Sequence, residues 1–98
     1  MSSSAIEIIV PTATDVAVTD DTLTVDLSDG RSISAPLAWY PRLVHASESE
    51  RNTWRLIGRG EGIHWPEVDE DISVEALIAG RASGESQQSF AKWLQSRK

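Results

Sequence analysis

The densest group of side chains that could bind a metal or move protons lies between His64 and Asp71. It contains one imidazole and four carboxylates, from His64, Glu67, Asp69, Glu70 and Asp71. A divalent cation could use such ligands, and His64, Asp69 and Asp71 are weak candidates for them. The stretch lacks the glycine and glutamate spacing of a calcium loop, and zinc normally takes more His or Cys ligands. We therefore favour carboxylates that are solvated or paired with arginines, with no metal and no cofactor.

No other arrangement predicts catalysis. The glycine-rich segment Gly58–Gly62 lacks the Lys-Ser/Thr pair of a P-loop, and no helix is predicted after it, so we interpret it as a hairpin connection. Ser83 has the wrong glycine spacing for a nucleophile elbow. The chain has no cysteine. Either histidine could act as a general base near neutral pH, but two histidines are unremarkable in 98 residues. We expect a protein that is not an enzyme.

Large aromatic side chains form the second notable group. The chain has four tryptophans, at Trp39, Trp54, Trp65 and Trp93. Tryptophan buries a large area in cores and is also favoured at interface hot spots. Core packing is the favoured interpretation for Trp54 and Trp65, with an interface as the alternative, and for Trp93 the two are balanced. The candidate residues for a partner interface are Trp65, Phe90, Trp93, Leu94 and Arg97.

Charge is distributed unevenly along the chain. Residues 1–80 carry 14 acidic and 5 basic side chains, whereas residues 81–98 carry 4 basic and 1 acidic side chain. The acidic body makes nucleic acid an unlikely partner, because phosphate contacts need Lys and Arg. The basic end could dock on its own body, on a second copy or on a partner, or it could be an ordinary solvated helix end. Another protein is therefore the favoured partner, with a homodimer as an alternative.

Targeting and membrane signals are not found in the sequence. The first ten residues lack the basic and apolar regions of a signal peptide. No apolar run approaches the roughly 20 residues needed to cross a bilayer. We expect a cytoplasmic protein that does not associate with membranes.

The pattern of apolar residues predicts an α+β fold. Between residues 15 and 36, apolar and polar side chains alternate as in half-buried strands, and Asp29-Gly30 suits a tight hairpin. Shorter extended segments are expected at 54–57 and 62–65. Together they predict an antiparallel β-meander of three to five strands, with helices packed on one face.

Two to four short helices are expected beside these strands. Residues 37–46 have helical apolar spacing, with Pro41 tolerable only in the first turn. Ser47 and Glu50 match a capping box, which predicts a short helix directly after Ser47. The last helix is C-terminal and amphipathic, over about residues 86–95, with a one-sided apolar stripe.

The length of the chain argues for one domain. We expect residues 1–14 to form a flexible N-terminal lead-in and residues 15–80 to form the α+β domain. Residues 81–98 are expected to form a hinge and a helix of the same domain. The sequence contains no internal repeat.

Five blocks of sequence carry a resemblance to a known family: Leu23–Arg31, Pro36–Leu43, Trp54–Gly58, Gly62–Pro66 and Asp69–Ser73. In their order, these blocks resemble the prokaryotic domain of unknown function numbered 2442. The resemblance covers about Val16 to Gly80 and extends into the tail. It implies a small bacterial or phage protein without an established activity. Some relatives resemble antitoxin-like partners of another small protein, and others carry a separate helix-turn-helix domain, which this sequence lacks.

These features predict a protein–protein interaction domain, as the antitoxin-like or regulatory member of a two-gene module. One alternative is a transcriptional regulator that binds nucleic acid. The other is a small-ligand or divalent-metal-binding domain that uses the region from His64 to Asp71.

Overall fold

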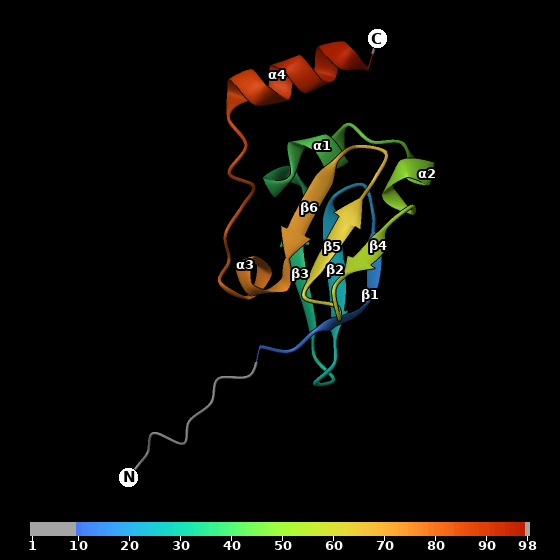
Figure 1. Ribbon diagram of the computed structural model, residues 1–98, viewed down its shortest axis with the longest axis vertical. Helices are drawn as coiled ribbons and strands as arrows, with labels where there is room; N and C mark the ends of the chain where they lie inside the picture. Colours follow the sequence, from blue (N-terminus) through green and yellow to red (C-terminus); the bar gives the residue numbers. More distant parts are fainter. Residues whose placement is uncertain (1–9, 98) are drawn as a thin grey trace.

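Alternating apolar and polar residues build the first sheet, as the sequence predicted. In the computed structural model, which describes residues 10–97, β1 (Ala13–Val18), β2 (Thr22–Leu27) and β3 (Ser32–Pro36) form an antiparallel meander (Figure 1). Along β2 every second side chain is buried, because successive side chains of a strand point to opposite faces. Gly30, with φ at 91°, allows the tight connection between β2 and β3.

A second antiparallel sheet follows, with β5 between its two neighbours. It consists of β4 (Arg55–Ile57), β5 (Gly62–Trp65) and β6 (Glu70–Ser73). The glycine-rich connection between β4 and β5 is a hairpin turn, as predicted. Within it Gly60 has φ at 92°, and its carbonyl oxygen accepts a 2.7 Å hydrogen bond from the Ala13 N–H. This bond ties the turn of the second sheet to the first strand of the first sheet.

The α+β class and the antiparallel meander are confirmed, with some differences in detail. The described residues contain six strands in two sheets, whereas one sheet of three to five strands was expected. β1 begins at Ala13, two residues before the expected start of the domain, because Ala13 is buried and pairs with Leu27. Residues 1–9 of the expected lead-in lie outside the described part of the chain.

One hydrophobic core joins the two sheets. Side chains of β2 and β5 meet in it, among them Leu23, Val25, Ile63 and Trp65. Trp65 is the largest of the fully buried side chains, and its indole N–H donates a 3.0 Å hydrogen bond to the Arg51 carbonyl oxygen. Its polar atom is therefore satisfied inside the core.

The helix expected over 37–46 is interrupted near its middle. A 3-10 helix, η2 (Leu37–Trp39), is followed by α1 (Pro41–Val44), with Pro41 in the first turn. Tyr40 between them has φ −128° and ψ 83°, outside the helical region, because a following proline disfavours helical backbone at the residue before it. This break directs the Tyr40 side chain inward, where it is 2% exposed.

The capping box is confirmed at the next helix, α2 (Glu48–Arg51). The Ser47 hydroxyl accepts a 3.1 Å hydrogen bond from the Glu50 N–H, and the Glu50 carboxylate accepts a 2.8 Å bond from the Ser47 N–H. This reciprocal pair satisfies two amide groups at the helix start.

Two further helices complete the described chain. α3 (Val74–Ile78) follows β6 directly, and Gly80, with φ at 72°, lies just beyond its end. A connection over 81–86 without regular secondary structure leads to α4 (Gln87–Ser96), the expected C-terminal helix. Figure 1 shows α4 at the end of the molecule where α1 and α2 lie. None of the helices within residues 10–97 has the length and apolarity needed to cross a membrane.

Candidate functional site

The predicted C-terminal stripe packs on the body of its own chain. Phe90, Trp93 and Leu94 are all half-buried on α4. The Phe90 ring lies 5.3 Å from the His45 ring, measured between centroids, and 5.8 Å from the Trp93 ring. Three of the predicted interface residues therefore share one face of α4, and that face rests against the end of α1.

Two guanidinium groups lie over the Trp93 indole. The Arg42 guanidinium is 5.3 Å from the ring centroid, and the Arg97 guanidinium is 4.7 Å from it. Contacts of this kind contribute about 0.5–1 kcal/mol at exposed sites. Arg97 also forms a 2.7 Å ion pair with Glu50. The hydrogen bond from Arg97, followed by that from the Ser47 N–H, lowers the pKa of Glu50 to about 2.

Trp65 does not belong to this surface. Its side chain is 0% exposed, because β5 is the middle strand of its sheet and the indole faces the shared core. Trp65 is therefore a core residue and does not contribute to the predicted interface. The other predicted members, Phe90, Trp93, Leu94 and Arg97, lie together on α4 or at its end.

The weak metal candidates are divided between two places. His64 and Asp71 face each other across β5 and β6, and the His64 Nδ1 contacts an Asp71 carboxylate oxygen. The Asp69 carboxylate lies instead 4.0 Å from the Arg42 guanidinium. Within residues 10–97 no group of three or more His, Asp and Glu side chains is placed to hold a metal ion.

Arg42 joins three parts of the chain. Its guanidinium donates a 2.9 Å hydrogen bond to Glu85 in the connection over 81–86, and further bonds to the carbonyl oxygens of Val68 (3.2 Å) and Asp69 (3.1 Å). The Arg42 and Glu85 side chains are 15% and 11% exposed. The hydrogen bonds from Arg42 lower the pKa of Glu85. This well-shielded pair therefore fastens the C-terminal connection to α1 and to the turn before β6.

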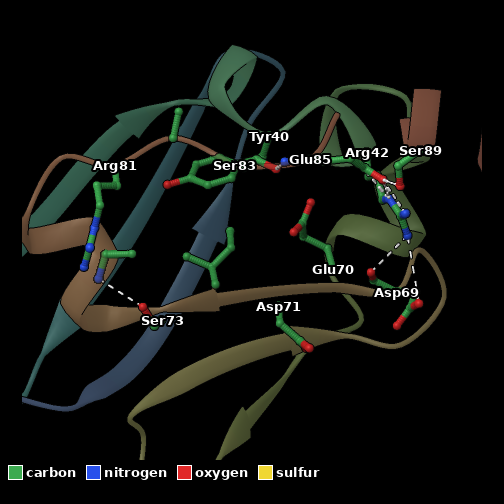
Figure 2. A pocket seen from close by; sticks show the side chains of 14 residues that line it. Tyr40, Arg42, Asp69, Glu70, Asp71, Ser73, Arg81, Ser83, Glu85 and Ser89 are labelled. Carbon is green, nitrogen blue, oxygen red and sulfur yellow. Dashed lines mark hydrogen bonds and ion pairs between the residues drawn. The ribbon is translucent and has the colours of Figure 1, made fainter. Parts of the chain in front are cut away.

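A cavity of about 580 Å³ lies between β6, α3 and this connection (Figure 2). Its polar lining residues are Tyr40, Arg42, Asp69, Glu70, Asp71, Ser73, Arg81, Ser83, Glu85 and Ser89. They come from segments far apart in the sequence, and packing of β6 against the connection over 81–86 brings them together.

Glu70, at the start of β6, carries the most perturbed carboxyl group at this cavity. Its Oε1 atom is buried and has no hydrogen-bond partner among residues 10–97. Burial raises the pKa of Glu70 to about 7; the charge of Arg42 opposes the shift, and that of Glu85 adds to it. Protonated and ionised forms of Glu70 are therefore both populated near neutral pH.

Tyr40 supplies the second unsatisfied group of the cavity. Its hydroxyl oxygen is buried and also lacks a hydrogen-bond partner in the described part of the chain. Burial, and then the charge of Glu70, raises the pKa of the Tyr40 hydroxyl. At neutral pH this hydroxyl is therefore protonated and can both donate and accept a hydrogen bond.

Unsatisfied groups of this kind mark a site that is costly to keep. A buried polar atom without a partner destabilises a protein by about 1–3 kcal/mol, and most native proteins contain few of them. A carboxyl group with a strongly shifted pKa in a cleft is also typical of functional sites, and here the shift has the same cause, burial. The cavity of Tyr40 and Glu70 is therefore the candidate binding site of the body.

Only part of this cavity is predicted by the sequence. The stretch that contains Glu70 stands out, but as a candidate for metal binding, and Tyr40 falls within the helix expected over 37–46. The break before Pro41 was the available signal for Tyr40, because the residue before a proline leaves the helical region. Nothing in the sequence indicated that Arg42 would pair with Glu85.

Comparisons with known proteins match the part of the chain that contains the two sheets. The sequence profile described as protein of unknown function (DUF2442) matches residues 13–83. A crystal structure of a protein of unknown function from Rhodospirillum rubrum is similar over 79% of this chain and 95% of that chain, with 26% sequence identity and a TM-score of 0.66. No curated protein matches the chain. The profile match includes Tyr40 and Glu70 and ends before Glu85 and α4.

Proposed function

The chain belongs to the DUF2442 family of proteins of unknown function, and we propose that it is a protein–protein interaction domain whose C-terminal helix α4 engages the partner. It acts by binding and not by catalysis. The sequence profile of the family ends at Ser83, so α4 is an addition to the body that the profile covers.

The observation that carries this proposal is the way α4 rests on the body. None of the residues of α4 is fully buried, although it is amphipathic. Phe90, Trp93 and Leu94 are each half-buried, so part of their apolar surface remains accessible on one side of the helix. Tryptophan in such a position is typical of a binding hot spot.

The contacts that hold α4 are of modest strength. The ion pair between Arg97 and Glu50 is at the surface, where such pairs contribute roughly 0–1 kcal/mol. Arg42 fastens the connection over 81–86 at Glu85, so a displacement of α4 that begins after Glu85 disturbs neither this pair nor a sheet. A partner can therefore compete for the apolar face of α4 at low cost to the stability of the body.

Charge indicates the chemistry of the partner. The basic end of the chain, with Arg81, Lys92 and Arg97 in the described part, contrasts with the acidic body. An apolar patch rimmed by carboxylates complements α4, and complementary charge speeds association and improves specificity. The product of a neighbouring gene is the first partner to test, as expected for the antitoxin-like or regulatory member of a two-gene module.

The test is co-expression of the full chain with the neighbouring gene product, followed by light scattering and calorimetry. A stoichiometric complex is expected, and Trp93→Ser should weaken it at least about tenfold, as for a hot spot. Gln95→Ser is the matched control, because Gln95 is exposed on the same helix. Equal affinities of the Trp93→Ser variant and the unchanged chain, or the absence of a complex, would contradict the proposal.

The same preparation tests the other partners. Analytical ultracentrifugation at low and high salt shows whether α4 joins two copies of the chain, and a dimer held by its charges should weaken with salt. A gel shift with the DNA upstream of the gene, at physiological salt, tests nucleic-acid binding. The acidic body predicts no shift.

A further inference from the structure

Two buried oxygen atoms of the body need hydrogen-bond partners that residues 10–97 do not supply. They are Glu70 Oε1 and Tyr40 Oη, and both residues line the same cavity. The two side chains reach the cavity from different elements, Tyr40 from the break before α1 and Glu70 from β6 (Figure 2). They do not bond to each other, so a ligand with two or more donors can offer a separate donor to each oxygen.

The charges around the cavity favour a cation. Its lining contains four carboxylates and two guanidiniums, from Asp69, Glu70, Asp71, Glu85, Arg42 and Arg81. Arg42 is already engaged by Glu85 and by two carbonyl oxygens. No salt bridge involves Glu70 within residues 10–97. The excess of carboxylates therefore attracts a positive group and repels an anion.

The size of the cavity suits an organic cation. Small-molecule sites typically measure about 300–1,000 Å³, and this cavity, at about 580 Å³, lies within that range. A bare metal ion does not fit the arrangement, because Glu70 is not accompanied by the further oxygen ligands that a hard cation needs. An ammonium or guanidinium group carries several N–H donors together with its charge.

We propose that the cavity of Tyr40 and Glu70 binds an ammonium or guanidinium group, which donates hydrogen bonds to Glu70 Oε1 and to the Tyr40 hydroxyl oxygen. Ionised Glu70 supplies the counter-charge. The same chemistry is offered by a free alkylamine or guanidine and by a lysine or arginine side chain of another protein. The site does not depend on the proposed role of α4, because neither oxygen belongs to that helix.

The first test follows the Glu70 carboxyl group by carbon NMR in the full chain, over a pH titration with and without methylguanidinium chloride. The apparent pKa of Glu70, about 7 without the probe, should fall by about one unit or more with it, because a bound cation favours the ionised form. Tetramethylammonium chloride at equal concentration is the control, since it has no N–H donor. Equal shifts with both salts, or no shift, would overturn the proposal, because solvent or a buried water then satisfies the carboxyl group.

Variants test the two named oxygens. Glu70→Gln, which removes the charge and keeps the shape, should weaken methylguanidinium binding at least about tenfold. Tyr40→Phe, which removes only the hydroxyl, should weaken it severalfold. Glu67→Gln is the matched control, because it removes an exposed carboxylate from the same stretch, outside the cavity lining. Equal weakening by Glu67→Gln and Glu70→Gln would overturn the site, since it would indicate general electrostatics alone.

A last comparison separates the two sources of the cation. A capped Gly-Arg-Gly peptide should bind at least about tenfold more tightly than methylguanidinium if the cavity receives a side chain of another protein. Equal or weaker binding of the peptide indicates a free small cation. No binding of either probe overturns the proposal. Trp93→Ser should leave all these results unchanged, which separates this site from the role of α4.

Discussion

Replacement of Glu70 tests the description of the cavity most directly. The pKa of Glu70 is about 7 in the folded chain, against an ordinary value of 4.5. At about 1.36 kcal/mol per pKa unit, this difference corresponds to about 3 kcal/mol. Because the carboxyl group is only partly buried, solvent screening reduces the expected effect to about 1–2 kcal/mol.

The sign of the effect follows from the direction of the shift. Folding raises the pKa of Glu70, so the folded chain holds the proton more tightly than the unfolded chain. The resulting stability is fully present below pH 4.5 and is lost as the pH rises from 4.5 to about 7. Above this range the ionised carboxylate remains buried, and the loss stays constant.

The assay compares the unchanged chain with Glu70→Gln in urea unfolding between pH 4 and pH 9. Glutamine cannot ionise, so the free energy of unfolding of the unchanged chain should fall by about 1–2 kcal/mol relative to Glu70→Gln between pH 4.5 and about 7. Glu67→Gln, at an exposed carboxylate, should leave the pH profile parallel to that of the unchanged chain. If the difference between the two proteins did not change with pH, or if the unchanged chain gained stability relative to Glu70→Gln as the pH rose, the pKa of Glu70 would not be raised in the folded chain.

Three other replacements test the core, the hairpin turn and the ion pair between Glu50 and Arg97. Trp65→Ala should reduce the free energy of unfolding by about 3–5 kcal/mol in urea titrations, because it leaves a large cavity at a fully buried position. Gly60→Ala should reduce the free energy of unfolding by more than about 1 kcal/mol, as measured by thermal melting. The added Cβ would lie 2.6 Å from the Ala13 carbonyl oxygen, and φ at this position is 92°. The lowered pKa of Glu50, about 2 against 4.5, gives stability that is present above pH 4.5 and lost as the pH falls toward 2. Glu50→Gln should therefore remove part of the acid-induced loss, as followed by circular dichroism, and should cost less than about 1 kcal/mol at pH 7.

Arg42 lies between α4 and the cavity of Tyr40 and Glu70. Its guanidinium lies over the Trp93 ring of α4 and pairs with Glu85 at the wall of the cavity. Arg42 thus contacts α4 on one side and the wall of the cavity on the other. Binding at the cavity and displacement of α4 can be measured separately, because Tyr40 and Glu70 lie outside α4 and Trp93 does not line the cavity.

Local features of this protein could be predicted from its sequence alone. Strict alternation along β2 predicted a strand because side chains of a strand alternate between two faces. Ser47 and Glu50 predicted the start of α2 because the capping box is formed by residues three apart. The one-sided spacing of Phe90, Trp93 and Leu94 predicted the apolar face of α4, which the structure confirms.

What these elements pack against became clear only from the folded chain. It placed Trp65 in the core and Trp93 on the surface, a choice that depends on which sheet or helix covers each indole. It also brought Tyr40 and Glu70, thirty positions apart, to one cavity. Burial raises the pKa of both side chains, and charges on other segments add to it. Glu70 raises the pKa of Tyr40, and Glu85 raises that of Glu70. Such effects depend on distances across the fold, which local sequence patterns do not encode.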